Sequence, residues 1–373
     1  MSNEVGKELV KNLNKKMKDN VAFELEDEDG SISDVNLFIP TGCTELDYII
    51  RNEPGGGIPV GKISTVSGLE ATGKSLFAMQ VMANAQKMGG FCVYLDTEQG
   101  LNTDFAKRVG LDWQNDFVHI KQISCEEVIT VINETAELVH KKKKDAKEKK
   151  EKPEHEFAII VWDSIAATPT KLDLESENPD PGSSIAVKPR ILSKNMNMLL
   201  RNAQRQNIAF LFVNQLRERI GGMPGQDPHV EPGGKAVPFA ASVRIRLQSI
   251  GKMKDSAGDI FGVQTRAKVI KNRFGPPHRQ AEFPIYFSYG IDDEESMVKV
   301  LTKHKKVESR PGGRNGTQYK FVGIDGEYNL IEFKRKIRNE PEFRKIADKF
   351  MEESLVKNLV DPRNIELEVI VGD

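Results

Sequence analysis

The sequence predicts an α/β fold with a mostly parallel central sheet, and three observations carry this prediction. From residue 37 to about residue 289, strand-like apolar runs alternate with helical patterns, which is typical of a parallel sheet covered by helices. One of these strands leads directly into a phosphate-binding loop and a helix. Other strands end in carboxylate or amide residues. The clearest expected strands span residues 62–66, 91–96, 157–163, 208–214 and 243–247.

A separate helix is expected before this core. Residues 5–17 place apolar side chains at intervals among lysines, which indicates a short amphipathic helix. The acidic stretch 24–29 separates it from the rest of the chain. An isolated short helix cannot bury its apolar face by itself. We therefore expect residues 1–36 to form an oligomerisation helix and a linker, with the helix docked on its own core or on a neighbouring subunit.

Residues 68–75 form a complete phosphate-binding P-loop, G-x-x-x-x-G-K-S. The loop follows the strand at 62–66 and precedes a helical run, 76–88, that stops at Gly89 and Gly90. A chance glycine-rich turn would not combine all these signals. Such a loop wraps its backbone N–H groups around phosphate, and its Lys and Ser reach the β- and γ-oxygens and Mg²⁺. The expected ATP-binding residues of the loop are Gly68, Leu69, Glu70, Ala71, Thr72, Gly73, Lys74 and Ser75.

Polar residues at the ends of three further strands complete an expected ATPase site. Asp163 ends an apolar strand and would hold Mg²⁺ together with Ser75, directly or through water. Glu98 follows the strand 91–96 and is placed to polarise the attacking water; a helix-capping or surface carboxylate is the alternative. Gln215 follows the strand 208–214, where an amide could sense the γ-phosphate or simply cap a loop.

Composition limits the classes of protein and partner. The chain has 373 residues and a formal net charge of −1, so any contact with DNA must come from local patches. The three cysteines have no C-x-x-C spacing, which argues against a zinc site or a disulfide framework and favours a reducing compartment, the cytoplasm, or the host cytoplasm if the chain is phage-encoded. No apolar run approaches the roughly 20 residues of a membrane span, and the first residues do not resemble a signal peptide.

Two segments outside the expected sheet are rich in charge. The lysine-dominated block 140–153 is expected to be a solvated helix end or a mobile hairpin, with DNA contact as the alternative. Residues 296–373 are expected to form a small α+β C-terminal domain. It would contain a Gly- and Arg-rich segment at 308–317, two strand-like runs around an Asp325-Gly326 turn, a helix at 340–353 and an alternating, strand-like run at 365–371. Its basic cluster could bind duplex DNA or be a solvated surface: Lys303, His304, Lys305, Lys306, Arg310 and Arg314.

The order of these motifs resembles bacterial and phage RecA-type recombinases. A P-loop is followed by a D-x-E strand end, an Asp-Ser strand end, and an Asn-Gln strand end before Arg217 and a glycine-rich segment. The similarity covers about residues 39–289 and is closer to RecA than to the phage UvsX group. It is carried by the phrases Phe105-Ala106-Lys107-Arg108-Val109-Gly110, Trp162-Asp163-Ser164-Ile165-Ala166-Ala167, Val213-Asn214-Gln215-Leu216-Arg217, Pro232-Gly233-Gly234, Lys268-Val269-Ile270-Lys271-Asn272-Arg273 and Gln280-Ala281-Glu282-Phe283.

The resemblance implies roles for individual residues. It makes Glu98 the residue that activates water and Gln215 the residue that couples the γ-phosphate to the DNA-binding loops. Phe105 stands where the family places an aromatic residue, usually Tyr, against the adenine. Lys271 and Arg273 align with two cations that reach the γ-phosphate from the adjacent subunit. Judged from the sequence alone, Lys271 and Arg273 would be ordinary surface charges. The resemblance to the family implies instead that ATP lies between subunits of a helical filament.

Two further segments resemble the family's DNA-binding loops. The first spans about residues 175–190 and the second 217–234. Ile185 and Ile220 fall where the family inserts apolar side chains between bases. The first loop is acidic and proline-rich before Ile185, which departs from the family pattern. The residues implied to contact DNA are Ile185, Arg190, Arg217, Arg219, Ile220, Gly221, Gly222, Gly233 and Gly234.

The resemblance implies an ATP- and Mg²⁺-dependent recombinase. It would form helical filaments on single-stranded DNA and catalyse pairing and strand exchange with homologous duplex DNA, in recombination and DNA repair. Single-strand-binding and loading proteins are candidate partners. A hexameric replicative helicase and a non-catalytic recombination mediator remain alternatives. The helicase lacks support because no long N-terminal primase-binding domain is expected. The mediator lacks support because all four expected ATPase residues are intact: Lys74, Glu98, Asp163 and Gln215.

Overall fold

The computed structural model describes residues 35–121, 123–175, 186–219, 227–312 and 316–356, with residues 8, 11, 12, 15 and 16 of the N-terminal segment. The chain divides into two units, Met1–Leu37 and Phe38–Asp373. In the first unit, residues 8, 11, 12, 15 and 16 are helical and exposed, but most of the helix expected at 5–17 lies outside the described residues. The strand expected at 365–371 lies outside them as well.

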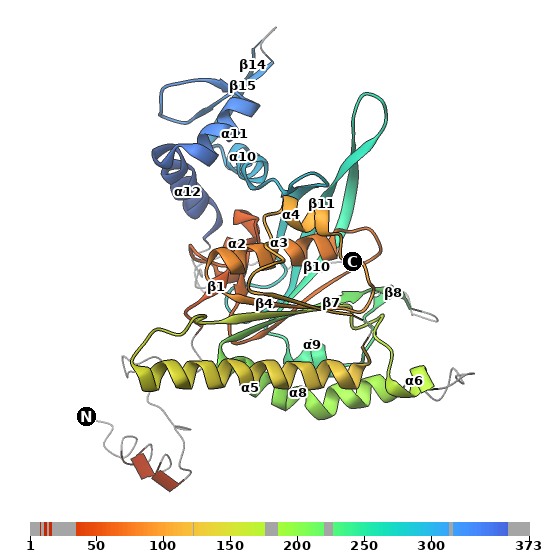
Figure 1. Ribbon diagram of the computed structural model, residues 1–373. Coiled ribbons are helices and arrows are strands. Elements are labelled where there is room, and N and C mark those ends of the chain that lie inside the picture. Colours follow the sequence, from red (N-terminus) through yellow and green to blue (C-terminus); the bar gives the residue numbers. More distant parts are fainter. Residues whose placement is uncertain are drawn as a thin grey trace, which may run out of the picture. The chain divides into compact units, whose positions relative to one another are not determined.

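A nine-stranded sheet organises the described part of the second unit, in the order β13-β12-β11-β10-β3-β7-β6-β4-β5 (Figure 1). The strands from β10 to β5 in this order are parallel to their neighbours, whereas β11, β12 and β13 are added antiparallel. The prediction of a mostly parallel α/β sheet is therefore confirmed. The strands span β3 (Ile63–Gly68), β4 (Phe91–Asp96), β5 (Phe117–Lys121), β6 (Ala158–Asp163), β7 (Ile208–Gln215), β10 (Val243–Lys254), β11 (Ile260–Asn272), β12 (Gln280–Tyr286) and β13 (Gly290–Ile291).

The central strands are buried along almost their whole length because helices cover both faces of the sheet. All six residues of β6 are buried, which is the pattern of a strand enclosed on both sides. On one face, the Trp162 ring meets the Phe212 ring edge-on, with centroids 5.6 Å apart. The strand expected at 243–247 is longer than predicted: β10 continues to Lys254 because it forms a hairpin with β11 that extends beyond the rest of the sheet.

Two sets of helices cover the sheet. In Figure 1, α5 (Cys125–Lys149), α8 (Val187–Gln206) and α9 (Ala236–Ala240) lie on one side, and α2 (Thr44–Arg51), α3 (Lys74–Lys87) and α4 (Thr103–Arg108) on the other. The lysine-rich block is the exposed end of α5, so the solvated helix end is confirmed and the hairpin is not formed. A capping box at Ser124 and Glu127 starts this helix. The short elements of this region are β1 (Phe38–Ile39), β2 (Ile58–Pro59), α6 (Lys171–Glu175), β8 (Arg217–Glu218) and β9 (His229–Val230).

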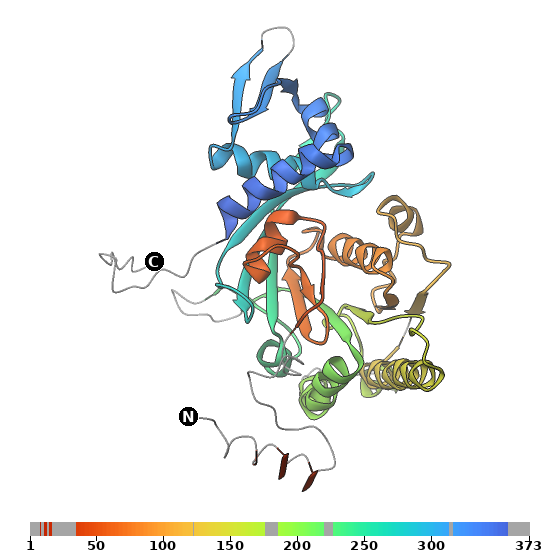
Figure 2. The same cartoon turned by 90° about the vertical axis from the view of Figure 1, so that its left-hand side faces the viewer.

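The C-terminal elements form an α+β layer with its own aromatic core (Figure 2). Phe321 lies 4.9 Å from Phe333 and 4.7 Å from Phe343, measured between ring centroids. Two details differ from the prediction: a strand occupies part of the Gly- and Arg-rich segment, and the run after the Asp325-Gly326 turn is mainly helical. The elements are α10 (Asp293–Lys303), β14 (Val307–Pro311), β15 (Thr317–Phe321), β16 (Tyr328–Asn329), α11 (Leu330–Asn339) and α12 (Pro341–Leu355).

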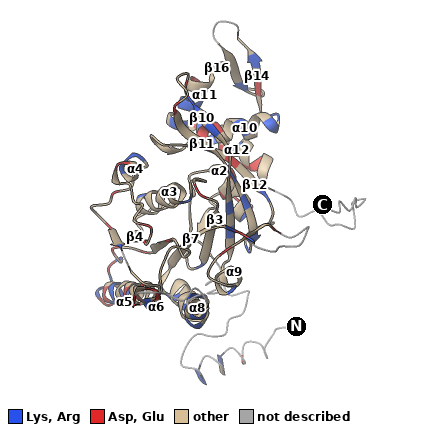
Figure 3. Cartoon of the chain, turned by 90° about the vertical axis from the view of Figure 1, so that its right-hand side faces the viewer, with Lys and Arg blue, Asp and Glu red and all other residues tan. Residues whose placement is uncertain are grey.

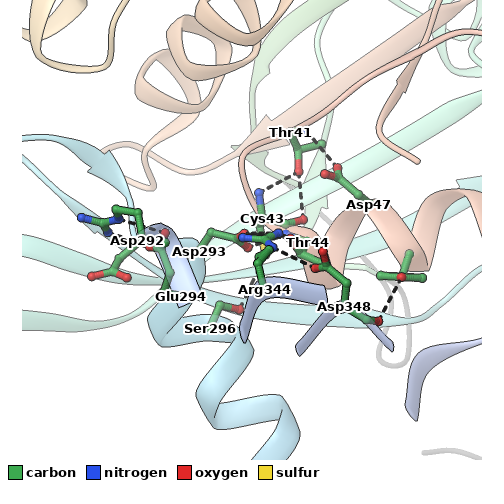
Figure 4. Close-up of polar contacts among 12 residues, drawn as sticks. Thr41, Cys43, Thr44, Asp47, Asp292, Asp293, Glu294, Ser296, Arg344 and Asp348 are labelled. Carbon is green, nitrogen blue, oxygen red and sulfur yellow. Dashed lines mark hydrogen bonds and ion pairs between the residues drawn. The ribbon is translucent and has the colours of Figure 1, made fainter. Parts of the chain in front are cut away.

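A polar cluster joins this layer to α2 (Figure 4). Asp293, at the start of α10, accepts hydrogen bonds from the Thr44 backbone N–H at 2.6 Å and from its hydroxyl at 2.7 Å. Arg344 of α12 lies 3.5 Å from the same carboxylate and 2.9 Å from Asp348. Burial raises the pKa of Asp293, and Arg344 and Thr44 oppose that rise. The C-terminal layer is thus fastened to the core by buried hydrogen bonds as well as by apolar contact.

Cys43, Cys92 and Cys125 are buried, and none forms a disulfide. Among the helices of the described ranges, none combines the length and apolar character that crossing a membrane requires.

Candidate nucleotide and DNA site

The P-loop joins the end of β3 to the start of α3, and its glycines are needed for close packing. Gly73 has φ 88°, and a Cβ there would lie 2.6 Å from Cδ1 of Ile285. A Cβ at Gly68 would lie 2.6 Å from the carbonyl oxygen of Leu247. A side chain at Gly68 would push the loop away from the β10 backbone, and one at Gly73 would be strained by the positive φ and would displace the end of the Ile285 side chain. The loop is thus held close to the sheet, with the first turn of α3 directly behind it.

Lys74 lies at the centre of the predicted site. Its ammonium group donates a hydrogen bond to the Leu69 carbonyl at 2.7 Å. Burial lowers the pKa of Lys74, and the negative charges of Asp163, Glu98 and Glu70 oppose that effect. The structure therefore brings residues from the P-loop and from the ends of β4 and β6 around one cation.

Asp163 has the surroundings of a magnesium ligand. It ends β6 with 3% of its surface exposed and accepts a hydrogen bond from the Tyr94 hydroxyl at 2.8 Å. Burial raises the pKa of Asp163, while hydrogen bonds from Ser75 and Tyr94 lower it. The Ser75 hydroxyl and the Asp163 carboxylate are thus direct neighbours. Both are hard oxygen donors, and this donor set fits Mg²⁺.

Glu98 is held against the end of β6. The Ser164 hydroxyl donates a hydrogen bond to its carboxylate, and the Thr97 hydroxyl donates to the carbonyls of Asp163 at 3.2 Å and Ser164 at 3.0 Å. The next helix, α4, takes its side-chain cap from Asn102 instead. The helix-capping alternative for Glu98 is therefore wrong. Glu98 is exposed, as a surface carboxylate would be, and its carboxylate lies beside the expected metal ligand.

Gln215 links the P-loop to the second predicted DNA-binding loop. At the end of β7, its side-chain amide donates to the Glu70 carboxylate at 2.8 Å. The preceding Asn214 donates to the Pro232 carbonyl at 2.9 Å, across the base of the same loop. The loop-closing role considered for an amide at this strand end is therefore filled by Asn214, while Gln215 contacts the phosphate-binding loop.

Lys271 and Arg273 do not join the P-loop of their own chain. In the sheet register, Lys271 lies opposite Arg244, which neighbours Thr65 of β3, whereas Gly68, where the P-loop begins, lies three residues further along that strand. The Lys271 ammonium donates to the Pro238 and Phe239 carbonyls at 3.1 and 2.7 Å. Burial and the charges of Arg273 and Arg244 lower its pKa. Phe105, the expected adenine-stacking residue, is only 5% exposed in α4, so little of its ring is open to a base.

The predicted DNA-binding loops are described only at their ends. Ile185, Ile220, Gly221 and Gly222 lie outside the described residues. Arg190, in the first turn of α8, and Arg217 and Arg219, beside the short β8–β9 pair, are exposed. Lys and Arg in Figure 3 are spread over several elements of the described chain, including α5, α8 and β10 to β12.

Gly233 and Gly234 have a packing role. They adopt φ values of 95° and 79°. A Cβ on Gly233 would come within 3.0 Å of Ile165, and one on Gly234 within 3.0 Å of Pro189 in α8. These two glycines therefore let the end of the second loop pass close to the first turn of α8. This contact explains them without a direct contact to DNA.

Sequence reasoning missed two residues of the site and one contact. Tyr94 donates a hydrogen bond to Asp163. Asp96 accepts hydrogen bonds from the backbone N–H groups of Gly100 and Leu101 and lies 3.1 Å from His119, so it shapes the turn that carries Glu98. Glu70 was expected in the P-loop, but its contact with Gln215 was not. The sequence held a signal for the two missed residues, because Tyr94 and Asp96 alternate on the strand that leads to Glu98 and so share one face.

Comparison with known proteins identifies the family. Residues 5–292 match the RecA N-terminal domain. The chain is 34% identical over 270 residues to Protein RecA of Clostridium perfringens, covering 72% of this chain and 70% of that protein. It is 32% identical over 320 residues to Protein RecA of Amycolatopsis mediterranei, covering 85% and 83%. For Protein RecA of Symbiobacterium thermophilum the identity is 34% over 265 residues, covering 71% and 69%. The chain therefore belongs to the RecA family of recombinases.

Proposed function

We propose that this protein hydrolyses ATP with Mg²⁺ while assembled as a helical filament on single-stranded DNA, and that the filament pairs with homologous duplex DNA and exchanges strands. The observation that carries the proposal is the convergence of Lys74, Ser75, Asp163 and Glu98 at the carboxyl ends of β3, β4 and β6. In an open α/β sheet this edge is where ligands bind. Membership of the RecA family connects this ATPase site with recombination.

Each residue of the site has a defined chemical task in this proposal. Lys74 and the P-loop backbone bind the β- and γ-phosphates, and Ser75 and Asp163 hold Mg²⁺, which when bound neutralises charge on the phosphates. Glu98 accepts a proton from the attacking water. The Ser164 hydroxyl occupies one oxygen of the Glu98 carboxylate, which leaves the other for water. Tyr94 holds Asp163 in place with its 2.8 Å hydrogen bond.

Gln215 provides the connection between nucleotide and DNA. Its amide binds Glu70 of the P-loop, and the second predicted DNA-binding loop begins two residues later, at Arg217. A γ-phosphate would compete with Glu70 for this amide, since both are anionic acceptors. Exchange of that one hydrogen bond would shift the first residues of the loop, among them Arg217 and Arg219. Those arginines would bind phosphates of the DNA backbone.

Lys271 and Arg273 act on the nucleotide of the adjacent subunit in this proposal. Their distance along the sheet from the P-loop of their own chain supports this role. Like charges from Arg273 and Arg244 crowd Lys271 and, with burial, lower its pKa. An anionic γ-phosphate from a neighbouring subunit would relieve this repulsion, so ATP binding would favour filament assembly. The protein is proposed to work in the cytoplasm, or in that of a host.

A strand-exchange assay tests the proposal. Circular single-stranded DNA and homologous linear duplex are incubated with ATP and Mg²⁺, and joint molecules are measured for the wild type, Lys74→Ala and the control Lys87→Ala, whose lysine is exposed at the other end of α3. We expect joint molecules that require homology and Lys74 but not Lys87. Unwinding of a forked duplex without homology would instead support a helicase. Binding of DNA and ATP with neither activity would support a mediator.

A further inference from the structure

The second predicted DNA-binding loop is fastened to the sheet by two ion pairs at its end. We call residues 227–234 the returning arm. Within it, Asp227 lies 2.5 Å from a terminal guanidinium nitrogen of Arg246, and Glu231 lies 2.7 Å from one of Arg244. The Glu231 side chain is 7% exposed and that of Arg244 20%, so this pair is shielded from water. Partial burial makes such pairs costlier to break than surface pairs.

The two arginines belong to the strand beside the P-loop strand. In the parallel register of β10 and β3, Arg244 neighbours Thr65 and Arg246 neighbours Ser67, the last residue before the P-loop. On the other side of the same loop, Gln215, two residues before the loop begins, is attached to Glu70 of the P-loop. One end of the loop is thus held on the strand beside β3, and the segment before its other end contacts the P-loop itself.

Each pair uses only part of its guanidinium group. Terminal nitrogens of Arg244 and Arg246 contact the carboxylates of Glu231 and Asp227. The Nε atoms of both arginines are buried and make no hydrogen bond with any described residue. A guanidinium group binds a carboxylate best through two parallel hydrogen bonds, and an unsatisfied buried donor is costly. Neither Nε atom therefore contributes to holding the arm.

The two ion pairs also neutralise negative charge beside the loop. Asp227 and Glu231 flank a loop whose proposed ligand is a polyanion, and unpaired carboxylates there would repel phosphates. Paired with Arg246 and Arg244, they are neutralised. Contact with Arg246 and His229 lowers the pKa of Asp227 against the opposing effect of burial, so this carboxylate stays charged and paired near neutral pH.

We propose that Arg244 and Arg246 are positioning residues that transmit DNA binding to the ATPase site, because their pairs with Glu231 and Asp227 hold the returning arm on β10. Movement of the loop on DNA would then move the strand next to the P-loop. This inference rests on the proposed function, in which the second loop binds DNA and ATP turnover depends on it.

The test compares DNA affinity with DNA-stimulated ATP hydrolysis. In the double variant Asp227→Asn with Glu231→Gln, two negative charges are lost near the DNA, so poly(dT) should bind as tightly as to the wild type or more tightly. The ratio of hydrolysis rates with and without poly(dT) should nevertheless fall about tenfold, the effect of losing about 1.4 kcal/mol of coupling. A merely structural role would weaken binding and stimulation together.

Two further variants make the test decisive. Glu282→Gln removes a comparable 2.6 Å pair with Arg266 on the antiparallel strands, and should leave the ratio unchanged. The single variant Asp227→Asn should lower the ratio of hydrolysis rates with and without poly(dT). The charge exchange Asp227→Arg with Arg246→Asp should restore much of that loss. Thermal melting checks that each variant is folded. A wild-type ratio in the double variant, or no rescue by the exchange, would overturn the inference. A wild type without DNA-stimulated hydrolysis would overturn the proposed function and this inference with it.

Discussion

Replacing Glu45 by Gln should change the pH dependence of stability. Glu45, in the first turn of α2, accepts a hydrogen bond from the Glu282 backbone N–H at 3.1 Å. Burial raises its pKa from 4.5 to about 7, against the lowering effect of that hydrogen bond and of Lys303. Between these values the unfolded chain loses the proton while the folded chain keeps it, so the contribution of Glu45 to stability falls as pH rises from about 4.5 to about 7.

The size of the effect follows from the two pKa values. At about 1.4 kcal/mol per pH unit, the full difference corresponds to about 3 kcal/mol. Glu45 is partly exposed, and screening by water reduces this to about 1–2 kcal/mol. Gln keeps the acceptor for the Glu282 N–H but never ionises. The variant should therefore match the wild type near pH 5 and be more stable by about 1–2 kcal/mol near pH 8.

Urea unfolding measures this difference. The fluorescence of buried Trp162 reports the transition, and the free energies of unfolding of wild type and variant are compared near pH 5, 6.5 and 8. Asp47 and Asp293 also have raised pKa values, but both proteins contain them, so the difference isolates Glu45. Glu53→Gln, at an exposed position, is the matched control and should show no such trend. A Glu45→Gln effect of equal size at all three pH values would refute the reasoning.

Three other substitutions test the site and the C-terminal layer. Tyr94→Phe removes the hydrogen bond to Asp163 and should weaken Mg²⁺-dependent nucleotide binding about tenfold, measured by calorimetry; an unchanged Mg²⁺ requirement would contradict the assigned contact. Gly73→Ala should strongly weaken nucleotide binding in the same assay, because its φ of 88° strains a residue with a Cβ and that Cβ would also displace the end of the Ile285 side chain; normal affinity would show that the loop adapts. Phe321→Ala should cost about 3–5 kcal/mol in urea unfolding while ATP binding by the core is retained, and a loss below about 1 kcal/mol would mean that the aromatic cluster repacks.

The elements that the sequence predicted best are those defined by local signals. The P-loop, its strand and its helix follow from one motif, and β4, β6 and β7 are apolar runs with polar ends. The length of β10 was not predictable in this way, because its outer half is stabilised by pairing with β11 rather than by burial. Helix α11 was also missed. It begins with an Asn329 cap and is held by Phe333 in an aromatic cluster drawn from distant segments.

Local signals also define the site residues that the sequence predicted, whereas the contacts that it did not predict join distant segments. Lys74, Asp163 and Glu98 stand at positions that their own strands or loops define. Their partners depend on strand order and register: Tyr94 reaches Asp163 because β4 and β6 are neighbours, with Asp96 opposite Asp163. A shift of one residue in the pairing register of β4 with β6 would turn Tyr94 to the other face of the sheet. No local pattern fixes that register, so the supporting contacts could only be read from the structure.

A mixing experiment can decide whether the site is shared between subunits. Glu98→Gln should lose the general base on the P-loop side, and Lys271→Ala with Arg273→Ala should lose the cations on the opposite side, so each protein alone should be inactive. Heterologous interfaces pair one side of a subunit with the other side of the next. In a random equimolar mixture, about a quarter of the interfaces would combine an intact Glu98 with intact cations, so about a quarter of wild-type hydrolysis should return. If all these residues acted within one chain, no mixture could restore activity, because every chain would carry a defect. Recovery therefore requires a site built from two subunits, as the separation of Lys271 from the P-loop in the sheet register implies.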